Sequence, residues 1–117
     1  MDNKGTNMKK SMMLIGLLSL ALGTSALAAE IKEVWEKNCA SCHGKDGKGE
    51  TKAGKKAEAK DLTDAKYQES FTDEKMLQQI KDGMKDKNGK EKMKPFGDKL
   101  SPEEIKGLIA YVRAFKK

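Results

Sequence analysis

The feature that most constrains this 117-residue chain is one short motif, Cys39-Ala40-Ser41-Cys42-His43. It holds the only two cysteines and the only histidine of the sequence. Two thiols at this spacing, followed directly by an imidazole, place three ligating groups in a single short segment. Any metal or cofactor that these three groups hold must therefore lie next to this segment in the fold.

Most sites that use such groups need residues that this chain lacks. A structural zinc site usually takes four ligands, and the motif supplies at most three. An iron–sulfur cluster usually takes four cysteines. A thioredoxin-like redox pair is expected beside a βαβ pattern, which the sequence does not show. A disulfide between Cys39 and Cys42 would close a very short loop, stabilise the fold little and leave His43 without a role.

The remaining interpretation is a covalently bound haem. C-x-x-C-H is the attachment signature of c-type haem, in which two thiols add to the two vinyl groups of the porphyrin. Cys39 and Cys42 would hold one haem c, and His43 would be the proximal iron ligand. Hydrophobic residues make up only 37% of the chain, and small domains with little to bury usually depend on a staple or cofactor. We therefore expect the chain to be largely disordered without haem.

The N-terminal segment has the pattern of an export signal. Three lysines precede an almost wholly apolar run over residues 12–22, and Ala26-Leu27-Ala28 fits the small-x-small cleavage pattern. The apolar run is too short to span a bilayer. We predict a cleavable signal peptide over residues 1–28 and a periplasmic domain over residues 29–117, with no stable membrane insertion after cleavage. Cleavage after Ala29 fits the pattern nearly as well. The alternative to a cleaved signal peptide is an uncleaved membrane anchor.

The charge pattern fits a small soluble domain better than a nucleic-acid binder. The chain has 24 Lys and Arg against 18 Asp and Glu, a formal net charge of +6, and the two signs are interleaved. A mixed charged surface is normal for such a domain. A nucleic-acid binder would show a basic stripe and aromatic stacking platforms, so we expect no nucleic-acid partner.

Apolar spacing and capping residues predict helices joined by long loops. We expect helices over residues 30–38, from Thr72 to Gly83, and from Ser101 to Phe115, where Ser101 and Glu104 can form a capping box. Residues 44–60 and 85–92 are expected to be loops. Asn88-Gly89 is a turn signal, but no alternating apolar residues flank it, so no hairpin is expected. The fold class is all-α, with three to four helices and long loops around the haem.

Three methionines outside the predicted signal are candidates for the sixth iron ligand. Met76 shares a helix face with Leu77 and Ile80, so we expect it to fill the core. Met84 follows the expected helix end at Gly83. Met93 precedes Pro95, and a loop stiffened by proline can hold a weak thioether ligand against iron. We predict His43 and Met93 as the axial pair, with Met84 and an open sixth position as the alternatives.

The chain resembles the small, soluble, single-haem bacterial cytochromes c of the His/Met kind (class I) over essentially the whole predicted domain. The resemblance lies in the CxxCH motif and in the stretch from Ile80 through Met93 to LSPEEIKGLIAYVRAF. It implies a cytochrome c-like fold in which the first and last helices cross. Ile31, Val34 and Trp35 would then meet Leu108, Tyr111 and Val112.

Two features depart from the family pattern. Lys94 stands between Met93 and Pro95, where the family often has Met-Pro. The proline that often follows CxxCH, and whose carbonyl orients the proximal imidazole, is absent. Because acceptors of this kind fix the ligand ring, we expect another carbonyl, from residues 57–61, to take this role.

The resemblance implies a periplasmic one-electron carrier rather than an enzyme, acting as a monomer between redox partner proteins. Lysines near an exposed haem edge would steer it to acidic partner faces; the candidates are Lys45, Lys48, Lys52 and Lys94. The alternatives are a haem enzyme subunit or small-molecule sensor with an open sixth position, and an exported interaction module without haem.

Overall fold

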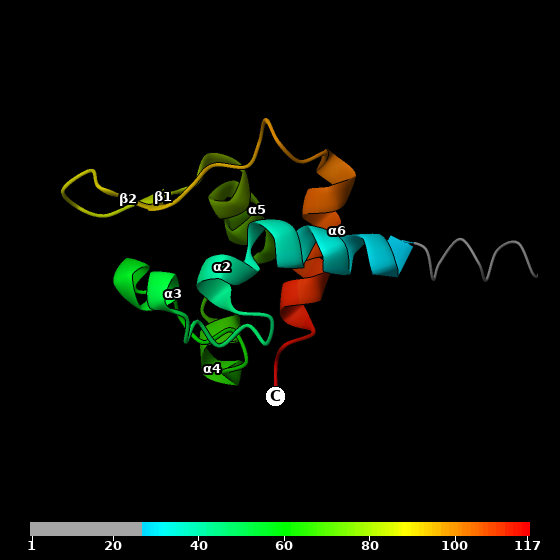
Figure 1. The fold of residues 1–117 in the computed structure, drawn as a ribbon, viewed down its shortest axis with the longest axis horizontal. Coiled ribbons are helices and arrows are strands. Elements are labelled where there is room, and N and C mark those ends of the chain that lie inside the picture. Colours follow the sequence, from blue (N-terminus) through cyan, green and yellow to red (C-terminus); the bar gives the residue numbers. More distant parts are fainter. Residues whose placement is uncertain (1–26) are drawn as a thin grey trace, which may run out of the picture. The chain divides into compact units, whose positions relative to one another are not determined.

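The computed structural model describes residues 27–117 (Figure 1). Contacts divide the chain into two units, Met1–Glu30 and Ile31–Lys117, and the fold below is that of the second. All but the last two residues of the predicted signal peptide lie outside the described residues, so the signal peptide and the domain boundary stay predictions. Within the described part of the chain, no helix combines the length and apolar character needed to cross a bilayer.

Helices dominate this unit, as predicted. A helix runs through residues 27–38 and is followed by the elements that Figure 1 labels: α2 (Ala40–His43), α3 (Lys52–Ala57), α4 (Ala65–Glu69), α5 (Asp73–Asp82), β1 (Met84–Lys85), β2 (Glu91–Met93) and α6 (Pro102–Arg113). The helices are more numerous than the three to four expected, because short ones occupy the connections.

The two longest labelled helices begin at the residues that the sequence predicts. Thr72 caps α5 by accepting a hydrogen bond from the Lys75 N–H, with Asp73 and Glu74 in the first turn. Ser101 and Glu104 form the expected capping box at the start of α6, where Pro102 takes the first helical position. Such caps satisfy backbone N–H groups that have no partner within the helix.

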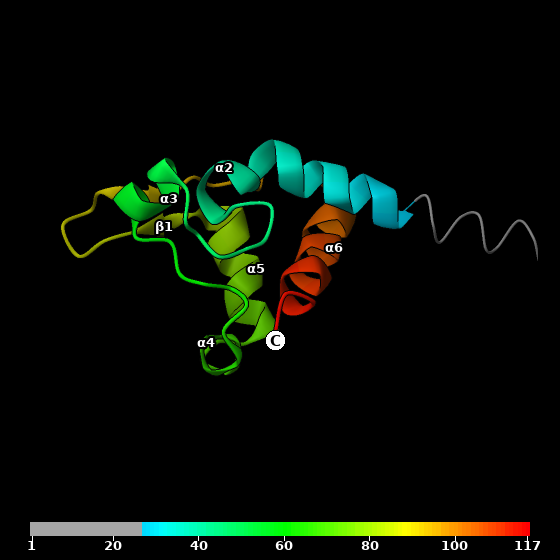
Figure 2. The ribbon, with the colours of Figure 1, turned by 60° about the horizontal axis from the view of Figure 1, so that its bottom comes forward.

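The core lies where residues 31–38 cross α6 and where α5 packs beside it (Figures 1 and 2). The predicted helix contact is confirmed: the rings of Trp35 and Tyr111 have centroids 5.5 Å apart. A Cβ atom on Gly107 would lie 2.4 Å from the Ile31 side chain, so glycine lets the two helices approach closely. The buried hydrophobic residues are Ile31, Trp35, Leu62, Met76, Ile80, Leu100, Ile105, Leu108, Ile109 and Val112.

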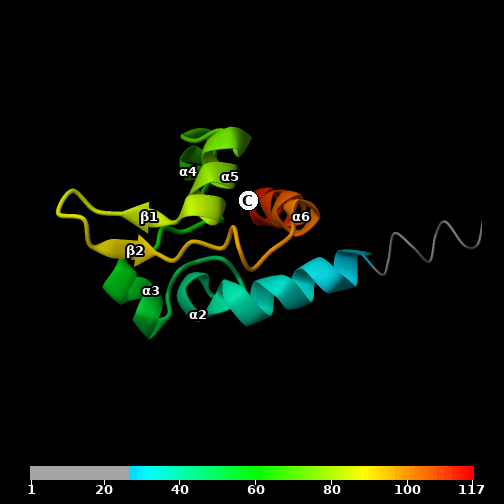
Figure 3. The ribbon, with the colours of Figure 1, turned by 90° about the horizontal axis from the view of Figure 1, so that it is seen from above.

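The expectation of no hairpin was wrong. Strands β1 and β2 pair antiparallel, with Met84 opposite Met93, and Figure 3 shows the ribbon projecting away from the helices. The carboxylate of Asp86 accepts hydrogen bonds from the N–H groups of Asn88 (2.8 Å) and Lys90 (2.9 Å). Gly89 has φ +81°, a left-handed conformation that glycine adopts readily. Turn chemistry forms this hairpin without an alternating apolar pattern.

The expected loop over residues 44–60 contains a helix, α3. Thr51 caps it by accepting from the Gly54 N–H, at 2.9 Å. The Thr51 hydroxyl also lies 2.7 Å from the Ser41 carbonyl and 2.9 Å from the Cys42 carbonyl, both in α2. A Cβ atom on Gly54 would come within 2.1 Å of that Cys42 carbonyl. Contacts with α2, rather than an apolar face of its own, therefore hold α3 in place.

Candidate functional site

The motif lies on one helical turn. The Cys39 N–H donates to the carbonyl of Trp35 at 2.9 Å, and the His43 N–H donates to the carbonyl of Cys39 at 3.0 Å. Residues four apart on a helix share a face, so the Cys39 thiol and the His43 imidazole project to the same side. Gly44, with φ +80°, ends the turn.

Both cysteines are free and half-buried in the structure. Burial, together with the nearby Cys42 thiol, raises the pKa of Cys39 to about 11. The Cys39 side chain is therefore a protonated thiol at neutral pH. Cys39 lines the pocket described below, whereas Cys42 does not.

The imidazole of His43 is enclosed on one side by the indole of Trp35, with ring centroids 5.6 Å apart. Burial lowers the pKa of His43, which favours the neutral ring, the form that binds metals. Its Nδ1 atom is buried and has no hydrogen-bond partner among the described residues. The expectation that a carbonyl from residues 57–61 accepts from this ring was therefore wrong. The carbonyls of Ala59 and Lys60 lie near Gly49.

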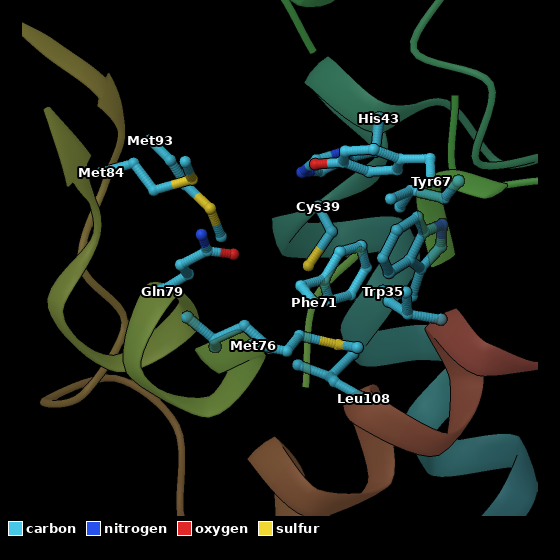
Figure 4. Close-up of a pocket in the computed structure, with 13 residues that line it drawn as sticks. Trp35, Cys39, His43, Tyr67, Phe71, Met76, Gln79, Met84, Met93 and Leu108 are labelled. Carbon is cyan, nitrogen blue, oxygen red and sulfur yellow. The ribbon is translucent and has the colours of Figure 1, made fainter. Parts of the chain in front are cut away.

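A pocket opens between this motif and the hairpin (Figure 4). Its empty volume is about 570 Å³, the open mouth included. His43 and Cys39 lie on one side of this space, and Met93 and Met84 lie on the other. The pocket is lined by Trp35, Cys39, His43, Leu62, Tyr67, Phe71, Met76, Gln79, Ile80, Met84, Met93, Leu108 and Val112.

The hairpin places two thioethers at the pocket. Directly opposed residues of an antiparallel pair point to the same face, so Met84 and Met93 reach the same space. Met93 is half-buried, whereas Met84 is 40% exposed. Met76 is 5% exposed and belongs to the core, as expected, although it also lines the pocket floor.

The backbone around Met93 is tied to the end of α5. The N–H groups of Phe96 and Gly97 donate to the carbonyls of Ile80 (2.9 Å) and Lys81 (3.0 Å). A Cβ atom on Gly83 would lie 2.5 Å from the Met93 carbonyl. Glycine at this position therefore allows the Met93 segment to pack directly on the helix end.

Three residues of the pocket were missed by sequence reasoning: Tyr67, Phe71 and Gln79. Tyr67 and Phe71 pack edge to face, with ring centroids 5.1 Å apart. Burial raises the pKa of Tyr67, so its hydroxyl stays protonated at neutral pH. Gln79 is a polar group in an otherwise largely apolar lining and lies one turn from Met76. Of the three, only Gln79 has a sequence signal for a place in the pocket, which is its helical spacing from Met76.

These residues fit a c-type haem. The lining is mainly apolar, as the porphyrin requires, and a neutral imidazole and a thioether lie on opposite sides of the space. The Cys39 thiol stands at one side of the pocket, beside the imidazole, and Cys42 lies on the same helical turn outside the lining. In the described residues, no group of three or more His, Cys, Asp and Glu side chains is arranged to hold a metal ion.

The predicted docking lysines lie outside this lining. Lys45, Lys52 and Lys94 are exposed, and Lys48 is half-buried. The hairpin and α3 are linked by an ion pair in which Lys92 Nζ lies 3.6 Å from Glu58 Oε1.

Comparison with known proteins places the chain in a family. Residues 26–112 match the family described as "Cytochrome C oxidase, cbb3-type, subunit III". A cytochrome c6 of Nostoc sp. is 36% identical over 112 residues, which cover 90% of this chain and 92% of that protein. The Cbb3-type cytochrome c oxidase subunit FixP of Azorhizobium caulinodans is 34% identical over 96 residues, which cover 82% of this chain but only 30% of the relative.

Solved structures agree with these sequence matches. The KustC0563 c-type cytochrome superposes with a TM-score of 0.64 and 37% identity, covering 74% of this chain and 96% of that one. A point mutant of that same cytochrome gives a TM-score of 0.61 at the same identity, covering 72% and 95%. The chain belongs to the cytochrome c family as a small, single-haem class I member with a cytochrome c-like, all-α fold, and its cofactor is covalent haem c.

Proposed function

We propose that the chain is a periplasmic one-electron carrier whose haem is attached through Cys39 and Cys42 and ligated by His43 and Met93. The observation that carries this proposal is the pocket in which His43 and Cys39 face Met93 across an apolar space. When bound, the haem supplies a one-electron Fe(III)/Fe(II) couple that takes an electron from a reduced donor protein and gives it to an oxidised acceptor protein.

The thiols provide attachment, and His43 provides the proximal ligand. Each thiol adds across a vinyl group, with sulfur on one carbon and hydrogen on the other, so attachment needs no oxidant. The thiol itself supplies that hydrogen, which Cys39 retains at neutral pH. The neutral imidazole that burial favours at His43 leaves a ring nitrogen free to bind iron.

Met93 is the better candidate for the sixth ligand. It is half-buried, and the hydrogen bonds from Phe96 and Gly97 to the end of α5 hold the segment that follows it. Met84 is more exposed than Met93, and Met76 is buried in the hydrophobic core. A thioether raises the reduction potential of haem iron and closes its sixth position. A closed site favours electron transfer over small-molecule chemistry.

The remaining features follow from the role of carrier. The N-terminal pattern supports export to the periplasm, where the cytochrome acts as a monomer without stable membrane insertion. The partners are redox proteins, and the exposed lysines Lys45, Lys52 and Lys94 favour acidic docking faces.

The visible spectrum of the oxidised holoprotein tests the ligand set. We expect the weak far-red absorption band that marks sulfur bound to ferric haem. The band should disappear in Met93→Ala and persist in Met84→Ala, which is the matched control on the opposite strand. Persistence in Met93→Ala would contradict the assignment of Met93.

Carbon monoxide separates the carrier from an enzyme or sensor. A haem with His and Met ligands should bind carbon monoxide slowly and incompletely in the reduced protein, whereas Met93→Ala should bind it rapidly. Rapid, complete binding by the unaltered protein would favour an open sixth position.

A further inference from the structure

The imidazole of His43 lacks the hydrogen bond that usually orients a haem-ligating histidine. Such a histidine generally donates its second ring N–H to a carbonyl or carboxylate, which fixes the ring orientation. Here Nδ1 is buried without a partner in the described part of the chain. The hydroxyl of Thr51 is directed to the carbonyls of Ser41 and Cys42. Another contact must fix the imidazole.

Trp35 contacts both His43 and the residue that follows it. The indole ring lies against the imidazole, with centroids 5.6 Å apart and planes inclined by 34°. The indole Nε1–H donates a buried hydrogen bond of 3.1 Å to the carbonyl of Gly44, the residue directly after His43. The Trp35 side chain therefore packs against one face of the imidazole and also anchors the backbone next to His43.

Trp35 is itself fixed by the last helix and by the turn that follows it. It is only 2% exposed. Its ring packs against Tyr111 and Phe115, with centroid distances of 5.5 Å and 5.1 Å. Both distances lie within the range of favourable aromatic pairs, about 4.5–7 Å. The crossing of residues 31–38 with α6 thus determines where the indole lies.

We propose that Trp35 is a positioning residue that sets the orientation of the His43 imidazole through its ring face and its bond to Gly44. This inference rests on the proposed role of His43 as an iron ligand. Trp35 also lines the pocket, but in this proposal it acts on the iron only by orienting His43. A small change in the indole should therefore rotate the imidazole without releasing it.

The experiment is proton NMR of the oxidised holoprotein. In low-spin ferric haem, the order and spread of the four ring-methyl resonances depend on the orientation of the axial ligand planes. Trp35→Phe removes the indole N–H and reduces the ring. Because Trp35 is the only tryptophan, its replacement by 3-benzothienylalanine removes the N–H alone and nearly preserves the volume.

Two controls separate positioning from packing. Tyr111→Phe keeps the aromatic cluster but removes a hydroxyl beside Trp35. Ile105→Val trims a buried core residue that does not line the pocket, so it lowers Tm without touching the site. We expect each Trp35 replacement to move the methyl resonances several-fold more than either control, while the far-red band persists.

The possible outcomes are distinct. A wild-type resonance order and spread in the benzothienylalanine protein and in Trp35→Phe would overturn the proposal. If Trp35→Phe takes up no haem, the benzothienylalanine protein alone decides. A wild-type protein without low-spin haem would overturn the proposed function itself, and this inference with it. A low-spin protein that is insensitive to Trp35 would overturn only the inference.

Discussion

Arg113 Nε and Asp73 Oδ1 lie 2.8 Å apart, which joins the last turn of α6 to the first turn of α5. The same guanidinium donates to the backbone carbonyls of Gln68 and Phe71 and to the Gln68 side-chain oxygen, and it stacks over the Phe71 ring. Gln68 is buried and donates in turn to the carbonyls of Leu62 and Val112. This network fixes the wall of the pocket that contains Tyr67 and Phe71.

Arg113→Lys should destabilise the holoprotein by about 2 kcal/mol, because lysine cannot make the forked hydrogen bonds and hydrogen bonds to charged groups are each worth about 1.5–3 kcal/mol. Asp73→Asn is the control, since an exposed ion pair contributes at most about 1 kcal/mol. Denaturant unfolding of both variants measures the difference. Equal losses would show that the ion pair, rather than the carbonyl bonds, dominates.

Gly83→Ala should displace the segment that carries Met93. Gly83 has φ +76° and ψ −174°, and a Cβ atom there would lie 2.5 Å from the Met93 carbonyl and 2.9 Å from Pro95 N. We expect a loss of more than about 2 kcal/mol, since a residue with a Cβ atom in this sparsely populated backbone conformation costs about 1–3 kcal/mol before any clash, together with a weaker far-red band.

Gly89→Ala is the matched control for this change. Gly89 also has positive φ, at +81°, but a Cβ atom there meets nothing within 4 Å. It should cost only the conformational strain and leave the far-red band intact. A similar loss of the band in both variants would show that backbone strain, rather than contact with the Met93 segment, is responsible.

Asp61 should make a small contribution to stability that disappears in acid. The hydroxyl and N–H of Thr63 donate to its carboxylate at 2.6 Å and 2.9 Å, which lowers the pKa of Asp61 below its usual value. A lowered folded-state pKa stabilises the fold above the unfolded pKa of about 3.9, and the effect is lost as the pH falls through the folded value. The Tm of Asp61→Asn should therefore lie below that of the wild type near neutral pH and approach it in acid, as the pH falls through the lowered pKa of Asp61. A constant difference in Tm would contradict this account.

The parts of the fold that the sequence predicts are those with local signals. The caps at Thr72 and Ser101 depend on side chains that bond within the same turn, so they are readable from neighbouring residues. The CxxCH motif likewise carries its own spacing, so each of these features needs only residues that are close in sequence. The crossing of residues 31–38 with α6 was implied by the family resemblance, and the contact of Trp35 with Tyr111 confirms it.

The features that were missed depend on contacts between distant segments. Helix α3 has no apolar face and is held by Thr51 and Gly54 against the carbonyls of α2. The hairpin depends on the carboxylate of Asp86 rather than on apolar alternation. Gln79 and Tyr67 reach the pocket only because α4 and α5 pack around it. The local hints of these arrangements are limited to the turn signal Asn88-Gly89 and the helical spacing of Gln79 from Met76.

Removal of haem attachment should unfold the domain. Of the ten hydrophobic residues that are buried within residues 27–117, six also line the pocket, so the group that fills the pocket completes much of the core. These six are Trp35, Leu62, Met76, Ile80, Leu108 and Val112. Small domains have little stability in reserve. We expect the Cys39→Ala/Cys42→Ala protein to lose most of its helical circular dichroism and its cooperative melting.

The control for this change is Ser41→Ala, which replaces an exposed residue between the two cysteines and leaves both thiols in place. It should retain bound haem, full helicity and a cooperative transition. If the double cysteine variant kept full helicity and melted cooperatively, the crossing of residues 31–38 with α6 would be sufficient to form the fold. The pocket would then be a preformed site, and haem binding would add stability to a domain that folds without it.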